Sequence, residues 1–164
     1  MSLGTIEQQS IEAFLRREAV ALDDRDWDTW LALFTEDCEY WVPAWRSDGK
    51  LVDDPANDIS LIYYDSRIGL EARVYRLRTE KVSSAQIMPR TTHFFQIMHA
   101  DPHGDAVAVR SHWTVHSVYE DRVATYFGHA HYQLVQFNDD WLIQRKKTIV
   151  QNDLVHQVLD FYNI

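Results

Sequence analysis

The sequence predicts an α+β fold in which a bent antiparallel sheet wraps around amino-terminal helices. Three observations favour it: apolar residues recur at helical spacing in the first half of the chain, they alternate with polar residues over 91–150, and turn-forming residues divide that region into strands. Helices that precede a run of strands are typical of α+β proteins. Strands longer than usual have to bend, so we expect the sheet to form a cone with a pocket.

Two helices are expected before the first strand. An apolar stripe predicts the first helix over about residues 6–23, and Asp26 is placed to cap a second, shorter one. Residues 38–43 then alternate as a short strand, which Pro43 ends. Because the second helix is rich in aromatic residues, we expect it to pack against the sheet as a plug. The residues that share its inner face are Trp27, Trp30, Leu31 and Phe34.

The middle of the chain combines a long loop with a third helix. Residues 44–58 lack periodicity and contain turn signals, so we expect a surface loop that serves in function or as an interface arm. Residues 59–64 suit a strand or the approach to a helix that begins at Asp65 or Ser66 and ends before Lys81. Four strands are expected after it, over residues 91–100, 106–120, 123–137 and 141–150, with Gly128 as a bend point.

Strict alternation assigns faces within these strands. It places the side chains of His93, Phe95, Ile97 and His99 on one side of the sheet. In the last strand it puts Trp141, Ile143, Arg145, Lys147 and Ile149 on the side opposite to Leu142, Gln144, Lys146, Thr148 and Val150. The apolar segment 154–164 is expected to dock on another surface.

Composition excludes several classes of protein. At 164 residues the chain has the length of one domain, spanning 1–164. Its net charge of −9 argues against nucleic-acid binding, which requires clustered Lys and Arg. Cys38 is the only cysteine, so no internal disulfide forms, as in a reducing compartment. Neither a signal-peptide pattern nor a run of ~18 apolar residues is present, so we expect a cytoplasmic protein that does not bind membranes.

Four of the histidines are candidates for a metal site. His112 and His116 share one face of a strand but lie ~13 Å apart, whereas His129 and His131 lie ~7 Å apart on the next strand. A cross-strand cluster of one residue from each pair could bind a metal. The alternative is a set of hydrogen-bonded or interface histidines.

A histidine–carboxylate pair is the second candidate site. His93 could meet Asp23 or Asp24 from the turn after the first helix, or Asp37, inside the cone. An imidazole oriented by a buried carboxylate is a competent general base. The alternative is that the aspartates cap helices and His93 is a packing or interface residue.

Other catalytic patterns are absent from the sequence. It has no Gly-rich phosphate loop, no Gly-x-Ser-x-Gly elbow and no Cys-x-x-Cys pair. A Rieske cluster needs two cysteines and two histidines, and one cysteine cannot supply it. A set of arginines forms either a solvated face or a patch that pairs with carboxylates of a neighbouring subunit. These arginines are Arg67, Arg73, Arg76, Arg78 and Arg90.

Several segments together resemble the small (β) subunit of aromatic-ring-hydroxylating dioxygenases. They are residues 27–37 with 40–43, residues 70–79, and Pro89-Arg90-Thr91-Thr92-His93. The ending, from Lys147-Thr148-Ile149-Val150 through Asp160-Phe161-Tyr162, is similar to the benzoate and anthranilate dioxygenase branch. The resemblance covers nearly the whole chain, with three motifs in the same order.

The resemblance implies a fold and a division of labour. The fold would be the cone-shaped barrel of ketosteroid isomerase, scytalone dehydratase and nuclear transport factor two. The enzyme would be a hexamer of three large and three small subunits, the small ones forming a trimer. The large subunit would hold the Rieske [2Fe–2S] centre and a mononuclear Fe(II), and a separate reductase would supply electrons from NADH. Both atoms of O₂ would be added to an aromatic acid to give a cis-diol.

Two functional hypotheses follow. In the first, the chain is a non-catalytic structural subunit, without cofactor or metal of its own, whose subunit contacts involve Arg73, Arg76, Arg90, Phe161 and Tyr162. In the second, the same cone serves a stand-alone isomerase or dehydratase, or a small-ligand binding protein, that uses His93 with Asp24 or Asp37. The sequence does not determine which aromatic acid is the substrate.

Overall fold

A computed structural model describes residues 2–84, 87–153 and 159–164 of the chain. Six strands form one sheet in the order β2-β1-β6-β5-β4-β3, in which β1 and β6 are parallel and all other neighbours are antiparallel. The elements are α1 (Thr5–Asp23), α2 (Trp27–Ala32), β1 (Phe34–Pro43), β2 (Ser60–Tyr64), α3 (Arg67–Ser84), β3 (Arg90–His103), β4 (Ala106–Tyr119), β5 (Arg122–Phe137), β6 (Asp140–Val150) and the short 3-10 helix η1 (Phe161–Asn163).

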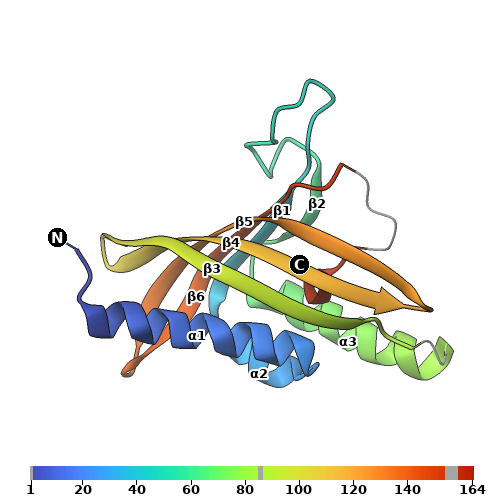
Figure 1. The fold of residues 1–164 in the computed structure, drawn as a ribbon, viewed down its shortest axis with the longest axis horizontal. Helices are drawn as coiled ribbons and strands as arrows, with labels where there is room; N and C mark the ends of the chain where they lie inside the picture. Colours follow the sequence, from blue (N-terminus) through green and yellow to red (C-terminus); the bar gives the residue numbers. More distant parts are fainter. Residues whose placement is uncertain (1, 85–86, 154–158) are drawn as a thin grey trace.

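The helices lie along one side of the sheet, and the sheet curves over them (Figure 1). Helix α1 runs along β3, while α3 packs against β1 and β2 at the other edge. The segment between β1 and β2 projects from the opposite side of the sheet. The predicted α+β fold with a bent sheet around amino-terminal helices is therefore confirmed. Within the described residues, no helix is long and apolar enough to cross a membrane.

The aromatic plug forms as expected. Asp26 caps α2, because its carboxylate accepts the backbone N–H of Thr29 at 3.2 Å. The buried ring of Trp30 then stacks on Phe161, with centroids 4.6 Å apart, and meets Phe34 edge-on at 4.9 Å. The C-terminal residues thus dock inside the same chain, and within 159–164 both Phe161 and Ile164 belong to the core. Residues 154–158 lie outside the described part.

Two bulges overturn the predicted faces. In β3, Ile97 pairs with Ser111 and His99 with Arg110, so Met98 is an extra residue and His99 points away from the side of His93. In β6, Ile143 pairs with Leu134 and Arg145 with Gln133, so Gln144 is extra. Lys146, Thr148 and Val150 consequently join Trp141 and Ile143 in the interior. Alternation alone could not place the bulges, because each inserts one residue into a continuous strand.

Gly128 lies where two strands approach closely. A Cβ built on Gly128 would lie 1.9 Å from the carbonyl oxygen of Ile149 on β6. Any other residue would therefore force the two backbones apart. Some predicted boundaries also shift: β1 begins at Phe34, α3 continues to Ser84, and β3 extends through His103 where a turn was expected.

Candidate functional site

The interior of the cone brings His93 and Asp23 together. Asp23 ends α1 and His93 lies on β3, with His93 Nδ1 2.5 Å from Asp23 Oδ1. The backbone N–H of His93 donates to Oδ2 of Asp23 at 3.0 Å, and the Thr91 hydroxyl donates to Oδ1 at 3.0 Å. Asp24 and Asp37 are exposed, and none of the contacts among the described residues joins them to His93. The prediction that Asp24 or Asp37 partners His93 is therefore wrong; Asp23, the third alternative, does.

This geometry fixes the orientation of the imidazole. Burial raises the pKa of Asp23, but the hydrogen bonds from His93 and Thr91 outweigh it and leave that pKa below its ordinary value. The ionised carboxylate can only accept, so Nδ1 of His93 carries the hydrogen, and in the neutral imidazole Nε2 is the nitrogen with the lone pair. Nε2 is buried and makes no hydrogen bond. The pair has the orientation of a general base.

The space around His93 is small. The cavity that its side chain lines has a volume of about 30 Å³. A cavity needs about 10–15 Å³ to hold a water molecule, whereas an engineered cavity that binds benzene has about 150 Å³. This cavity therefore has room for a few water molecules beside His93 and is too small for an aromatic ring. The remaining lining is mostly apolar and includes Leu15, Leu22, Phe95, Trp113, Ala130 and Ile164.

A buried ion pair was not predicted. Lys146 Nζ lies 3.1 and 3.2 Å from the two carboxylate oxygens of Glu18, and both residues are 3% exposed. The hydroxyl of Tyr132 and the indole N–H of Trp30 also donate to this carboxylate, at 2.7 and 3.3 Å. With all its acceptor sites engaged, Glu18 stabilises the interior rather than a ligand. The sequence indicates only Glu18, which lies on the apolar stripe of α1. Strict alternation places Lys146 on the side opposite to Trp141, because it does not account for the bulge in β6.

The candidate histidine metal site does not assemble among the described residues. His112 and His129 are cross-strand neighbours with ring centroids 4.7 Å apart, but His131 pairs with Arg110 and His116 with Thr125. In the described ranges, no three His, Cys, Asp or Glu side chains come together as a metal site would require. Cys38 is buried, and burial raises the pKa of its thiol to about 11, so it does not suit an iron ligand. These donors fit neither a Rieske cluster nor a mononuclear iron.

The residues predicted to form subunit contacts lie in different environments. Arg73 forms a partly buried ion pair with Asp160, which ties the C-terminal residues to α3, and Phe161 lies in the core. Tyr162 is half-buried against Trp27, whereas Arg76 and Arg90 are exposed. Of the other arginines, Arg67 binds Glu71 and the Phe34 carbonyl, and Arg78 binds Asp28. The interface assignment of the five residues stays a prediction.

Comparisons with known proteins agree with this picture. The family model of the ring hydroxylating beta subunit matches residues 17–157. The 2-halobenzoate 1,2-dioxygenase small subunit of Burkholderia cepacia is 38% identical over 94% of each chain. The crystal structure of the benzoate 1,2-dioxygenase beta subunit of Burkholderia mallei superposes with a TM-score of 0.75 at 34% identity, covering 100% of this chain and 99% of the other.

A more distant structure confirms the cone-shaped fold. A scytalone dehydratase candidate from Novosphingobium aromaticivorans superposes with a TM-score of 0.66 at 19% identity, over 93% of this chain and 91% of its own length. That likeness concerns the fold alone. The family match and the 38% identity go further, and the resemblance read from the sequence is confirmed. The chain belongs to the ring-hydroxylating beta subunit family and is the small subunit of an aromatic-ring dioxygenase, an oxidoreductase whose other component is a large oxygenase subunit.

Proposed function

We propose that this chain is a non-catalytic, structural subunit of a benzoate-type 1,2-dioxygenase that converts an aromatic acid to a cis-diol. One observation carries the structural role: the interior of the cone is filled by aromatic and C-terminal side chains, which leave a cavity of about 30 Å³. The names of the relatives, which act on benzoate or a halobenzoate, support an aromatic acid as substrate. The whole chain, residues 1–164, acts as one domain in the cytoplasm.

The redox groups belong to the partner in this proposal. The Rieske centre and the mononuclear Fe(II) would be held by the large subunit, with NADH electrons arriving through a reductase. This chain supplies no matching donor set among its described residues, because Cys38 is buried and the histidines do not converge. Its own contribution is to hold the assembly together, as a trimer within a hexamer of three large and three small subunits.

Helix α3 supplies the exposed groups for one contact of that assembly. Arg76 and Tyr75 are exposed on it, and Arg90 is exposed at the start of β3. Arg73 is a poor test residue, because its replacement would leave Asp160 unpaired inside the chain. Exposed arginines and aromatic rings are typical of interfaces, so charge reversal at Arg76 and Arg90 tests the contact without touching the core.

The experiment is co-expression with a Rieske-type large subunit, followed by native mass from light scattering and iron analysis. We expect an iron-containing hexamer from the unmodified pair, and a lower hexamer yield for Arg76→Glu with Arg90→Glu. Arg122→Glu, an exposed substitution at the start of β5, is the matched control and should leave assembly unchanged. A small subunit that ignores the large one would contradict the proposal.

The Asp23–His93 pair favours a second candidate, a stand-alone isomerase or dehydratase or a small-ligand binding protein. Its imidazole is oriented as a base, and its Nε2 faces no protein partner. This candidate requires turnover or saturable binding of aromatic acids by the lone chain, and loss of either in His93→Ala. Absence of both in the unmodified chain would remove it.

A further inference from the structure

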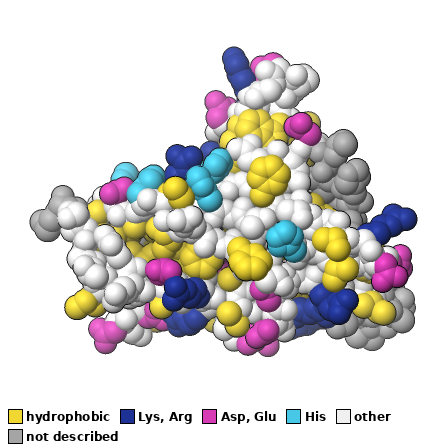
Figure 2. Space-filling model, viewed as in Figure 1, with side chains coloured by type: hydrophobic (Ala, Val, Ile, Leu, Met, Phe, Trp, Pro, Cys, Tyr) yellow, Lys and Arg dark blue, Asp and Glu magenta, His cyan; other side chains and the backbone are white. Residues whose placement is uncertain are grey.

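A row of basic side chains crosses the outer face of the sheet. The register places His99 opposite Arg110, Arg110 opposite His131, and His131 opposite Lys147, on four neighbouring strands. We call these four residues the basic row. The face turned to the viewer in Figure 2 shows histidine and hydrophobic side chains together over this part of the sheet. Such a row is unexpected in a chain whose net charge is −9.

Two cations of the row, Arg110 and Lys147, flank His131 on the neighbouring strands. Burial lowers the pKa of His131, and Arg110 and Lys147 lower it further. Burial and Arg145 lower the pKa of Lys147, although Asp53 and Glu39 of the same chain act in the opposite direction. The positive charges of Arg110 and Lys147 thus act on His131, and an acidic partner would offset them.

Among the described residues, a direct contact with a carboxylate forms at only one end of the row. His99 contacts Asp101 at 3.2 Å, and Lys147 Nζ lies over the ring of Trp41 at 4.6 Å. Arg110 forms no ion pair among the described residues, and its Nε is buried without a hydrogen-bond partner. Beside the row runs a groove of about 190 Å³ that is lined by His103, His131, Arg145 and Lys147. The groove is large enough to receive carboxylate side chains.

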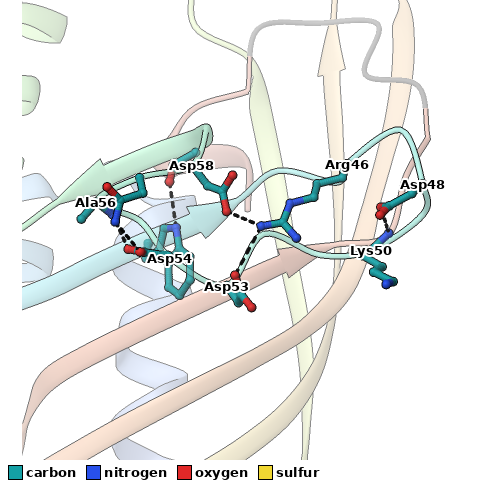
Figure 3. A network of polar contacts seen from close by, with 10 residues as sticks. Arg46, Asp48, Lys50, Asp53, Asp54, Ala56 and Asp58 are labelled. Atoms are coloured by element: carbon teal, nitrogen blue, oxygen red, sulfur yellow. Dashed lines mark hydrogen bonds and ion pairs between the residues drawn. The ribbon is translucent and has the colours of Figure 1, made fainter.

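The same chain carries a preorganised acidic element. Residues 44–58, which we call the arm, project from the sheet between β1 and β2 (Figure 1). Arg46 binds Asp58 and, at 3.4 Å, Asp53, while Asp54 accepts the N–H of Ala56 at 2.9 Å (Figure 3). The base of the arm is fixed by the Trp45 indole, which donates to the Val150 carbonyl at 2.7 Å. An ordered arm loses little conformational entropy on binding.

The arm leaves carboxylates available. The Asp53 side chain is 84% exposed despite its contact with Arg46. Asp48 is exposed as well and accepts only the backbone N–H of Lys50, at 3.0 Å. None of the ion pairs within the described residues joins the arm to the basic row of its own chain. Asp53 attracts the charge of Lys147 at one end of the row, but no ion pair between described residues closes this gap within the chain.

We propose that the arm of one copy docks its aspartates on the basic row of a second copy of this chain. The inference rests on the trimer named under the proposed function and assigns its two contact surfaces. Because arm and row are different surfaces, the contact is head-to-tail, and such a contact closes into a ring when the rotation permits. Exposed Phe94, Met98 and Phe127 lie on the same outer face and provide apolar area beside the charges.

The test is the native mass of the full-length chain, alone and with the large subunit, for charge-reversed variants. Arg110→Glu alters the row and Asp53→Arg alters the arm; we expect each to weaken trimer association at least tenfold. His131→Glu, an exposed site in the row, replaces Arg110→Glu if that variant fails to fold by circular dichroism. Arg122→Glu and Asp105→Arg, exposed outside both surfaces, are the matched controls and should form trimers.

Two further measurements sharpen the result. The double variant Arg110→Glu with Asp53→Arg restores opposite charges across the contact, so it should regain trimer. Raising the salt concentration from about 0.1 M to about 1 M shortens the screening length from about 10 Å to about 3 Å and should dissociate the unmodified trimer.

Each contrary outcome overturns a different statement. A trimer that survives Arg110→Glu and His131→Glu removes the row from the interface. A trimer lost in the row variants but kept in Asp53→Arg shows that the arm is not the occupant. Row variants that trimerise yet fail to bind the large subunit assign the row to that partner. An unmodified chain that is monomeric even with the large subunit refutes the trimer itself, and hence the proposed function.

Discussion

The interior of the cone and the outer face of its sheet differ in how their charged side chains are paired. Inside, Glu18 and Lys146 neutralise each other and Asp23 holds His93. Outside, Arg110 and Lys147 lie in one cross-strand row with His131 between them and have no ion-pair partner among the described residues. The interior pairs its charged groups within the chain, whereas the outer face leaves Arg110 and Lys147 outside any ion pair of the described residues.

The difference teaches where function resides in this subunit. The cavity inside this cone has a volume of about 30 Å³, and the ion pair that lines it serves the fold. The outer face instead combines exposed aromatic rings with basic residues, the composition of an interface core and its rim. Under the proposed function, this chain therefore contributes to the enzyme through its surface.

The largest expected effect comes from breaking the interior pair. Lys146→Met leaves the buried Glu18 carboxylate without its counter-charge and should lower the free energy of unfolding by about 3–5 kcal/mol. Urea denaturation measures it. Adding Glu18→Gln to that variant removes the buried charge but keeps an acceptor for Tyr132, so it should recover most of the loss. Equal stability of the single and double variants would contradict the assigned role of the pair.

Lowering the pH is expected to have an intermediate effect on the free energy of unfolding. The pKa of Asp23 is lowered in the folded state, so its ionisation stabilises the fold above pH 3.8, the ordinary value of this carboxyl, and that contribution is lost as the pH falls below it. As the pH falls from about 5 to about 2, urea midpoints should fall more steeply for the unmodified chain than for Asp23→Asn. Parallel curves would mean that the Asp23–His93 contact does not favour the ionised form.

The smallest effect on stability is expected on the outer face. Phe94 is 55% exposed and touches His116 only at its ring edge, so Phe94→Ser should change the free energy of unfolding by less than about 0.5 kcal/mol. Its trimer yield should nevertheless drop, as should that of Phe127→Ser. Phe137→Ser, on an exposed ring at the end of β5, serves as the control. A loss of stability without a change in trimer yield would mean that Phe94 serves the fold and not the contact.

Much of the fold and part of the candidate site could be predicted from local patterns. The Asp26 cap, the aromatic face of α2 and the four long strands follow from residue types and spacing, because caps and periodicities act within a few residues. The choice among Asp23, Asp24 and Asp37 could not be made, since it depends on how α1 ends against β3. The Glu18–Lys146 pair could not be predicted either, since it depends on the bulge in β6 that turns Lys146 inward.

By itself, the sequence determined the α+β class, the family and the absence of a cysteine set for an iron–sulfur cluster. Composition, period and ordered motifs carry that information along the chain. Only the tertiary structure decided which side chains face inward, because the single extra residues at Met98 and Gln144 reverse the faces beyond them. The basic row exists for the same physical reason: the bulge at Met98 turns His99 outward to face Arg110, and the bulge at Gln144 turns Lys147 outward to face His131.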